Sequence, residues 1–474
     1  MSDKEFQVFL TLDDQDLTGK LVLAGKDTLL TVHAKDPIVK LPEYVECICQ
    51  DGQKASLLNC LSFGGGRSMY HKEVIYRAQA FPHIVVLGPH HCTADESSVA
   101  SFSFHLSDAE QLFFHLEPWI QGDHYEFSDD QQSYTQTFSF TEPSVIFEAV
   151  SAVGKVSAYH APSFTGPSMS GFSAENRVMV SIESGRPISI NELIELIYKF
   201  KYFSEVCSGR PQSIDNISFV SSEQADEGHP VILDLIISHS EDDSGQDRYA
   251  SGYDMLAAPC LDRSDFEALV ISWFNEDDYR RRVALSRFSS NLKSDNHYDS
   301  NRLVSAASLF EWFDSSRKVE VPENIVSFIE QTKATLLALP ESDMQNRFLN
   351  MLGNAGSETL QLKIRRQLEG VLSVLDGYDS FDKRKAEQVI AYAVKCRNAL
   401  VHGVRDRKVG RVLEAHQIFL IETLEVLFAC LCLHTAGWSI RRQDDRHLRG
   451  STRYCGFLHE FNTRAEQLFA DADR

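Results

Sequence analysis

Two different patterns of apolar and polar positions divide this chain. In the first part, short runs alternate apolar and polar residues, as at Phe102, Phe104 and Leu106, which is typical of β-strands. Turn signals such as Gln50-Asp51-Gly52 separate these runs. From Ser264 onward the apolar residues recur every three or four positions, as in amphipathic helices. The patterns predict an α+β chain, with an antiparallel, sandwich-like β-rich part before an all-α helical bundle.

A few helices are expected inside the β-rich part. Ser189 with Glu192 three residues later forms a capping-box signature, and a broad apolar stripe follows it. The spacing also predicts a helix over Ser264–Phe274. The glycine run at Gly64–Gly66 is expected to be a flexible hairpin connection, because no Lys-Ser/Thr pair follows it to form a phosphate loop. The helices predicted in the last part are Asn301–Phe313, Glu323–Leu339, Asp343–Leu352, Glu358–Leu375, Lys383–Leu400, Val409–Leu433 and Arg464–Phe469.

These patterns suggest where the domains divide. Residues 1–288 are predicted to form an acidic, β-rich N-terminal domain whose last part, 264–288, is helical. The polar residues 289–300 are predicted to be a linker, and 301–474 an all-α domain. A length of 474 residues fits two to four domains, so the first part can be one domain or two.

Composition narrows the class of protein. Apolar residues make up 43% and charged residues 24%, as in globular proteins. The most apolar stretch, Ile418–Leu433, is interrupted by Glu422 and Glu425, which favours a buried core helix over a membrane span. Met1–Glu5 contains no apolar signal segment. The ten cysteines form no CxxC pair, so we expect free thiols in the cytoplasm and predict neither a metal site nor a cofactor.

The charge is distributed unevenly between the two parts. The net charge is −22, from 46 basic and 68 acidic residues. From His297 to the end, 24 of each occur, which leaves 22 basic and 44 acidic residues before it. Such asymmetry suggests different roles for the two parts. Basic clusters in the neutral part can be either solvated helix faces or phosphate contacts. They are Lys363–Arg366, Lys383–Lys385, Arg405–Lys408 and Arg441–Arg442.

One motif at the end of a predicted helix carries candidate chemistry. Arg397 falls in a row of apolar residues, where a charge is costly unless it is paired or faces an interface. Asn398 and His402 are four apart and share the adjacent face. Gly403 suits the position just past a helix end, where the helix dipole favours positive charge. A histidine beside an arginine is suited to acid/base work near neutral pH.

Spacing alone does not decide what this motif does. Arginine followed four to six residues later by histidine occurs elsewhere in the chain, for example at Arg67 and His71. A capping histidine with a salt-bridging arginine is the competing structural interpretation. What sets Arg397 apart is the asparagine directly after it and its place at the end of a long amphipathic helix that runs into glycine.

The pattern Arg-Asn-x-x-x-His-Gly, within an all-α C-terminal domain, resembles the HEPN ribonuclease signature. Asn301–Phe313 resembles the first helix of that domain in the ApeA-like branch, where an apolar helix with a central acidic residue precedes the motif helix. The acidic, β-rich first part resembles the N-terminal domain of ApeA-type proteins by element order. The resemblance covers nearly the whole chain, and its C-terminal part is the more specific.

The resemblance implies a prokaryotic antiviral protein of the abortive-infection type, a toxic ribonuclease. HEPN domains usually dimerise and build one composite, metal-independent site that uses the RNA 2′-OH as nucleophile. Arg397 would then stabilise the charged transition state, His402 would act as general base or acid, and Asn398 would orient the phosphate or His402. Glu311 is a weaker assignment, a polar partner from the first helix, and a solvent-facing glutamate is an equal alternative for it.

The resemblance also suggests partners. Single-stranded or loop RNA is the natural substrate, since in-line attack is easiest in flexible strands. A tRNA anticodon loop would fit, although no residue singles it out. The chain is expected to form at least a homodimer through its HEPN domain, without a membrane, while the N-terminal domain senses a phage-derived trigger or restrains the nuclease. Two alternatives stay open: a non-catalytic HEPN dimerisation and interaction protein, and a carbohydrate-binding β domain with a helical appendage.

Overall fold

The chain forms two compact units in its computed structural model, one ending at Glu276 and the next beginning at Asp277. The structure describes residues 4–37, 40–70, 73–113, 120–128, 133–140, 145–168, 171–224, 229–238, 252, 255–276, 278–294, 297–314, 323–353, 358–378, 380–403, 406–438 and 453–473.

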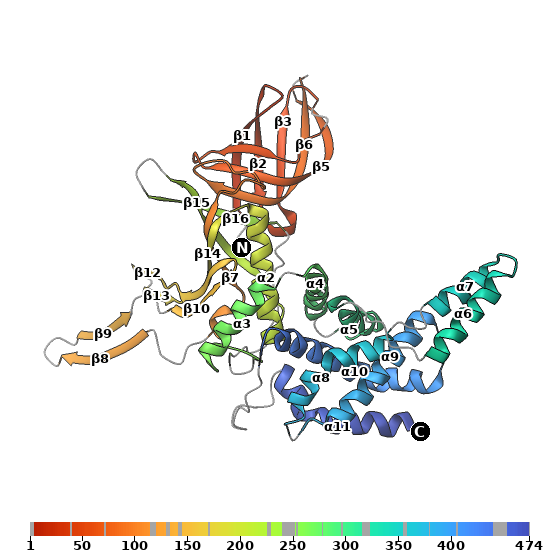
Figure 1. The fold of residues 1–474 in the computed structure, drawn as a ribbon. Helices are drawn as coiled ribbons and strands as arrows, with labels where there is room; N and C mark the ends of the chain where they lie inside the picture. Colours follow the sequence, from red (N-terminus) through yellow and green to blue (C-terminus); the bar gives the residue numbers. More distant parts are fainter. Residues whose placement is uncertain are drawn as a thin grey trace. The chain divides into compact units, whose positions relative to one another are not determined.

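The first six strands of unit 1 close into a barrel (Figure 1). They are β1 (Lys4–Leu12), β2 (Gln15–Leu23), β3 (Leu29–Ala34), β4 (Val45–Cys49), β5 (Lys54–Tyr70) and β6 (Glu73–Gly88), with a short 3-10 turn at Gly25–Asp27. Their order is β6-β3-β2-β1-β4-β5, and β5 pairs back onto β6. Closure leaves no unpaired edge between these strands, and alternating residues such as Val8 and Leu10 fill the interior.

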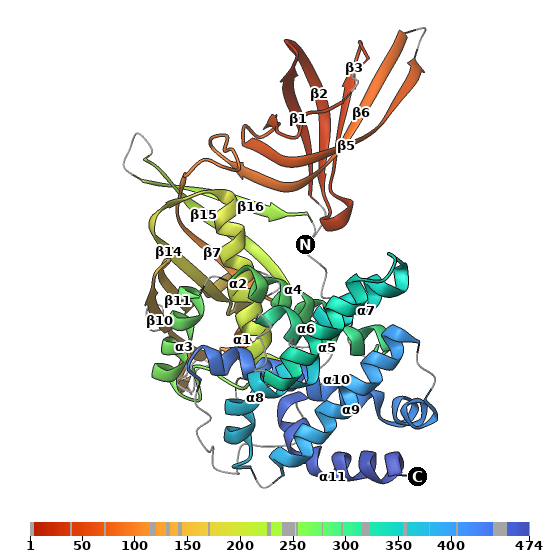
Figure 2. The same cartoon turned by 45° about the vertical axis from the view of Figure 1, so that its right-hand side comes forward.

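Strand β6 then passes from the barrel into an open antiparallel sheet (Figure 2). Its residues 76–80 pair with β3, whereas 84–87 pair with β16. The open sheet has the order β16 (Pro230–Ile237), β15 (Ile214–Gln224), β7 (Val99–Leu106), β14 (Val178–Ile188), β11 (Gly154–His160), β10 (Val145–Ser151). Two separate hairpins are β8 (Ile120–Ser128) with β9 (Ser133–Phe140), and β12 (Ser163–Ser168) with β13 (Gly171–Glu175).

Helices α1 (Ala109–Leu112), α2 (Ile190–Ser208) and α3 (Arg263–Asn275) accompany the open sheet. The predicted capping box of α2 is confirmed: the Glu192 backbone N–H donates to Ser189 Oγ at 3.2 Å, and the Ser189 N–H donates to Glu192 Oε2 at 2.9 Å. Buried aromatic rings from these helices and from β10 pack together in the core, with the centroids of neighbouring rings 5.0–6.3 Å apart. They are Phe113, Phe147, Phe200, Phe203 and Phe266.

The glycine run and the paired cysteines both lie within strands. The glycine run was expected to be a hairpin connection, and this is wrong: Gly64–Gly66 lie inside β5, at a register shift between Ser62 and Gly65. Gly64 has φ +59°, which glycine adopts without strain, so the run makes a bulge rather than a turn. Cys47 and Cys49 both point to the buried side of β4, because side chains two residues apart in a strand lie on the same face. Burial raises the pKa of Cys47 to about 12, so its thiol stays protonated.

Unit 2 is entirely helical in its described residues. Its helices are α4 (Tyr279–Lys293), α5 (Ser300–Phe313), α6 (Glu323–Leu337), α7 (Asp343–Gly353), α8 (Leu360–Leu375), α9 (Lys383–His402), α10 (Arg407–Thr435) and α11 (Arg453–Asp473). The predicted fold class, an antiparallel β-rich part with a few helices before an all-α bundle, is thus confirmed. The part expected to be sandwich-like is a barrel that continues into an open sheet. Helix α11 begins eleven residues before its predicted start at Arg464.

The units divide earlier than the sequence suggested. We expected the β-rich domain to end at 288 and a linker to span 289–300, but α4 runs through to Lys293 and lies in unit 2. Its Phe288 ring packs 5.5 Å from that of Phe428 on α10. The polar composition misled because Ser289 and Asn291 are buried, and Ser305 Oγ donates to Asn291 Oδ1 at 2.7 Å.

A buried ion pair joins α5 to the central helix α10. Arg302 donates to Glu425 through Nε at 2.9 Å and through Nη2 at 3.0 Å, and both side chains are at most 3% exposed. Arg453 of α11 donates to the same carboxylate. Glu425 therefore supplies the counter-charge of the buried Arg302 and also pairs with the partly exposed Arg453. Without such pairing, a charge buried in the bundle would be strongly unfavourable.

Among the described residues, one helix, α10, is long and apolar enough to span a membrane. The most apolar window of this helix is 78% buried inside the protein. Glu425 within it is neutralised by arginines of neighbouring helices, as described above. The burial agrees with the expected core helix.

Unit 1 contains a histidine held between two carboxylates. His105 of β7 lies 2.7 Å from Asp215 of β15 through Nδ1, and 2.8 Å from Glu110 of α1 through Nε2. Burial acts to lower the pKa of His105, but the hydrogen bonds to Asp215 and Glu110 outweigh it and raise the pKa to about 9. Glu110 also accepts the Val178 N–H of β14, at 3.0 Å, so the charged imidazole ties three strands and a helix together.

This clamp predicts a pH-dependent stability for unit 1. Its contribution is fully present below pH 6.5, where the unfolded histidine is also charged, and is lost as pH rises through about 9. The loss amounts to at most about 3 kcal/mol, reduced by solvent around Asp215. Urea unfolding of wild type and His105→Gln should therefore converge between pH 6.5 and 9. His33→Gln, at an exposed position on β3, is the control, and a constant wild-type-to-His105→Gln difference would contradict the assignment.

The buried ion pair predicts a large destabilisation of unit 2 by Glu425→Gln, about 3–5 kcal/mol, because the buried guanidinium of Arg302 loses its counter-charge. Glu422→Gln on the same helix removes a more exposed pair with Arg464 and should cost less than about 1 kcal/mol. Denaturant unfolding followed by the helical circular dichroism signal measures both. Equal effects of the two substitutions would show that the Glu425 pairing does not hold the bundle.

Candidate active site

Helix α9 carries the Arg-Asn-x-x-x-His-Gly motif at its C-terminal end. The helix starts at Asp382, whose side chain accepts the Lys385 N–H at 2.9 Å, and its apolar side, including Ile390 and Ala393, is buried. It ends at His402, two residues beyond the predicted Leu400. Gly403 follows with φ +66° and donates its N–H to Ala399 O, as expected of a glycine just past a helix end.

Arg397 is paired across the bundle with Glu311. Its Nη2 donates to Glu311 Oε1 of α5 at 3.0 Å, and its Nη1 donates to Asn398 Oδ1 at 3.2 Å. The Arg397 side chain is 17% exposed and that of Glu311 is 40% exposed. Arg397 Nε is buried and has no hydrogen-bond partner among the described residues. The structure thus brings together Arg397, Asn398 and Glu311, and leaves the Nε donor of the guanidinium without a partner among the described residues.

His402 lies apart from this group within one chain. It is exposed on the last turn of α9, as is Asn398 one turn earlier. Five residues along a helix correspond to a rotation of about 140°, so His402 and Arg397 face different directions. Within the described part of the chain, no hydrogen bond joins His402 to Arg397 or Glu311. A substrate group that contacts both His402 and Arg397 must therefore span two faces of α9, or contact His402 of one copy and Arg397 of another.

Two basic residues that the motif analysis did not single out close the helix end beside Glu311. Arg280 of α4 donates to the backbone carbonyls of Glu311 and Asp314, at 3.0 and 3.2 Å, and Lys363 Nζ of α8 donates to Glu311 O at 2.9 Å. Burial and the charge of Arg280 lower the pKa of Lys363. Cations at a helix C-terminus satisfy its free carbonyls and fix the last turn that carries Glu311.

The basic clusters of the helical unit differ in what their charges contact. In the first, Lys363 holds α5, and Arg366 pairs with Glu358 and Asp314 at 2.8 and 2.9 Å, so these charges serve the fold. Arg407 and Lys408 are exposed on the first turn of α10, just after the motif, and are free to meet solvent. The Arg441–Arg442 cluster lies outside the described residues.

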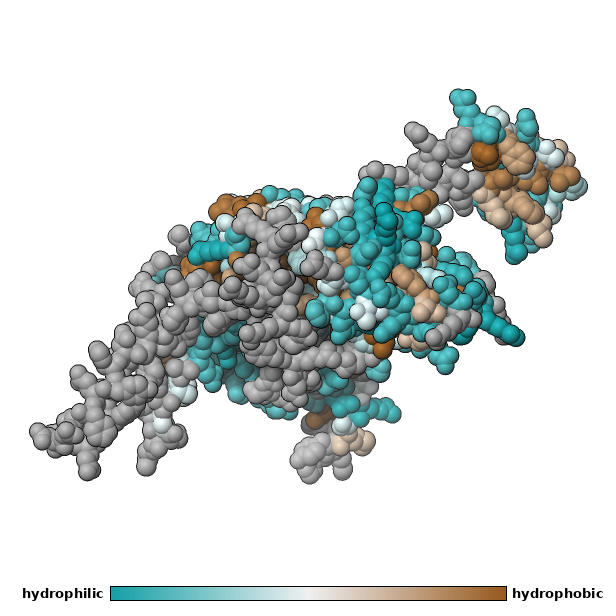
Figure 3. Space-filling model, turned by 90° about the horizontal axis from the view of Figure 1, so that it is seen from below, coloured by the Kyte–Doolittle hydropathy of each residue, from teal (hydrophilic) through white to brown (hydrophobic). Residues whose placement is uncertain are grey.

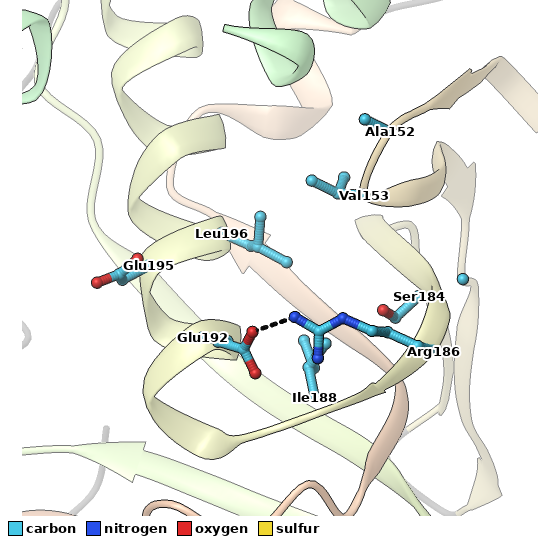
Figure 4. A pocket seen from close by; sticks show the side chains of 9 residues that line it. Ala152, Val153, Ser184, Arg186, Ile188, Glu192, Glu195 and Leu196 are labelled. Atoms are coloured by element: carbon cyan, nitrogen blue, oxygen red, sulfur yellow. Dashed lines mark hydrogen bonds and ion pairs between the residues drawn. The ribbon is translucent and has the colours of Figure 1, made fainter. Parts of the chain in front are cut away.

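Unit 1 contains a surface hollow among its described residues that could be considered a second site. A hollow of about 440 Å³ lies between the β10–β11 turn, β14 and the start of α2 (Figure 4). Two of its three charged side chains pair with each other, since Arg186 Nη2 donates to Glu192 Oε1 at 2.5 Å. The described residues contain no group of three or more His, Cys, Asp or Glu side chains placed to hold a metal ion. We therefore assign no ligand to this unit.

Profiles of known protein families match both units of the chain. The profile of ApeA N-terminal domain 1 matches residues 5–273, more than half of the chain. The profile of the Apea-like HEPN domain matches residues 304–441, which include α9 and its motif. No curated protein and no solved structure matches the chain. With its β-rich unit and its helical unit each matched in the expected order, the chain belongs to the ApeA family and carries a HEPN domain.

Proposed function

We propose that this protein is an anti-phage endoribonuclease that cleaves RNA without a metal ion and causes abortive infection. HEPN domains are generally ribonucleases and typically dimerise, which supports the activity and a composite site from two copies. The observation that carries the proposal is that Glu311 holds Arg397 next to the exposed Asn398, with His402 exposed on the last turn of the same helix. An arginine kept in place by a carboxylate still has guanidinium N–H donors for a further anionic group.

The proposed reaction is attack of an RNA 2′-OH on the adjacent phosphate. His402 accepts the 2′ proton as the new O–P bond forms, and a second copy of His402 protonates the departing 5′ oxygen. The products are a 2′,3′-cyclic phosphate and a free 5′-OH. Arg397 stabilises the doubly charged phosphorane-like transition state with its guanidinium fork. Asn398 orients the phosphate or the imidazole, and Glu311 positions Arg397.

Charge and chemistry indicate the substrate and the division of labour. Flexible single-stranded RNA or an exposed loop suits in-line attack, and a tRNA anticodon loop meets both conditions. Before His297 the chain holds 44 acidic and 22 basic residues, which disfavours RNA binding there. We assign to unit 1 the recognition of a phage-derived trigger or the restraint of the nuclease, and place the protein in the cytoplasm.

One observation favours a second function, a non-catalytic interaction protein. In the single chain Arg397 is already neutralised by Glu311, and His402 points elsewhere. Such an arrangement serves a helical bundle that only dimerises. The two functions differ in whether RNA cleavage depends on both motif residues.

We expect the purified full-length protein to cleave total tRNA in the presence of a chelator. Arg397→Ala and His402→Ala should each reduce the cleavage rate at least about 100-fold, because each removes a group that acts in the transition state. Gel analysis of end-labelled RNA, with detection of the cyclic phosphate, measures the rate and the chemistry.

Matched controls use residues of the same types outside the motif. Arg384→Ala on the exposed side of α9 and His459→Ala on α11 should retain wild-type cleavage. If phage genes must be co-expressed to elicit activity, growth arrest replaces the purified assay, with the same four variants. Cleavage that survives both motif substitutions rules out this site, and loss of activity in all four variants points to folding.

Glu311→Gln tests the positioning role of the carboxylate. Because the guanidinium remains but loses its counter-charge, we expect a smaller loss of cleavage than for Arg397→Ala, on the order of tenfold. Combining Glu311→Gln with Arg397→Ala should add nothing to the loss caused by Arg397→Ala alone. Independent, multiplying effects would show that Glu311 acts on something other than Arg397.

A further inference from the structure

Helices α6 and α7 form a hairpin whose geometry is set by its own sequence. At the turn, Gln345 Nε2 donates to the carbonyls of Leu336 and Leu339, at 2.5 and 3.3 Å, and so closes the end of α6. Gln345 Oε1 accepts the Ser342 N–H, and Ser342 Oγ accepts the Gln345 N–H, both at 3.2 Å. This reciprocal pair is a capping box at the start of α7. The hairpin is therefore a specified element and not a passive connection.

The hairpin nevertheless leaves its apolar side chains in solvent. Gln345 is its one buried residue among those described in α6 and α7. The exposed large apolar side chains of the hairpin are Ile325, Val326, Phe328, Leu337, Leu339, Met344, Phe348 and Met351. In Figure 1 the hairpin projects from the body of the bundle, and in Figure 3 it is the lobe at the right, with brown, apolar residues gathered on the face turned to the viewer.

The stripe on α7 has the form of a helical docking face. Met344, Phe348 and Met351 are 61%, 48% and 67% exposed and stand at positions i, i+4 and i+7. This spacing places them on one side of the helix, as in amphipathic helices that lie against a partner. Helices of 15 and 11 residues are marginal in water unless an apolar face is covered. A clustered apolar surface of this kind marks an interaction site.

We propose that a second copy of this chain covers the α6–α7 hairpin and that the hairpin grips it beside the active site. This inference rests in part on the proposed function, which requires two copies. The hairpin begins after α5, whose last turn carries Glu311, and ends before α8, whose first turns carry Leu362 and Lys363. Apolar residues are also exposed where the hairpin joins the bundle and beside the motif: Trp312 at the end of α5, Leu362, and Val401 next to His402. An interface over the hairpin that extends to these residues would include the motif helix.

Charge selects a protein rather than RNA as the occupant. Between residues 323 and 353 the hairpin carries four acidic side chains, Glu323, Glu330, Glu341 and Asp343, against Lys333 and Arg347. A weakly acidic, apolar surface repels phosphates and suits an apolar protein face. In a two-fold symmetric dimer the same stripe meets its own copy, so the hairpin supplies both halves of the contact.

The test is the mass of the full-length protein in solution, measured by sedimentation velocity over a range of concentrations. Phe348→Glu combined with Met351→Glu places two charges in the stripe, and because both residues are exposed the fold should persist. Asn346→Glu combined with Asn350→Glu adds the same two charges on the polar side of α7 and is the matched control. We expect wild type and control to be dimers, and the dissociation constant of the stripe variant to be at least about 100-fold higher.

The outcomes separate this inference from the proposed function. The inference is overturned if the stripe variant associates as strongly as the wild type. It is also overturned if the wild type is monomeric and its stripe is protected from oxidation, because another part of the same chain would then cover the hairpin. Arg397→Ala should abolish cleavage without changing the mass, so a failed nuclease leaves the dimer measurement valid. Cleavage by the stripe variant should recover as its concentration rises. If the stripe variant is monomeric yet cleaves normally, the hairpin contact is supported, but the composite site of two copies is ruled out.

Discussion

The buried ion pair between Arg302 and Glu425 is the constraint on which the helical unit depends. Two parallel hydrogen bonds fix the rotation and the axial position of α5 against α10, since a shift of either helix would strand a charge in the core. Glu311 lies nine residues further along α5, about two and a half turns, so its position follows from that register. Arg280 and Lys363 then hold the last turn by its carbonyls. The carboxylate that meets Arg397 is thus placed by contacts at both ends of one helix.

Sequence patterns predicted the local part of this architecture well. The start of α9 at Lys383, the glycine that ends it and the capping box of α2 follow from neighbouring residues, and all appear in the structure. The Glu311–Arg397 contact joins residues 86 apart, so no spacing rule could establish it, and only a resemblance suggested it. Helix α4 was assigned in part to a linker because its polar Ser289 and Asn291 resemble a loop; their burial depends on partners from other helices.

In the β-rich unit, too, the sequence predicted local elements but not the contacts between distant ones. Alternation predicted most strands, yet it does not say which strands pair, and barrel closure depends on β5 and β6, which are longer than ordinary strands. The glycine run inside β5 shows why a turn signal can mislead: the bulge bends a long strand so that it serves the curved barrel. β6 then divides its length between two partners, so one strand determines both the barrel and the first pairing of the open sheet.

The candidate site is only half assembled in a single chain, and this has a consequence for control. Glu311 neutralises Arg397 and keeps it in place, while His402 faces away from it on the last turn of the same helix. A toxic nuclease built in this way would be inert as a monomer, because its cation is occupied and its acid/base group has no phosphate held beside it. Association would supply the missing group, and the incoming RNA phosphate would compete with Glu311 for the guanidinium. Any element that governs association, whether the exposed hairpin or the acidic unit 1, would then govern the chemistry without touching the reacting atoms.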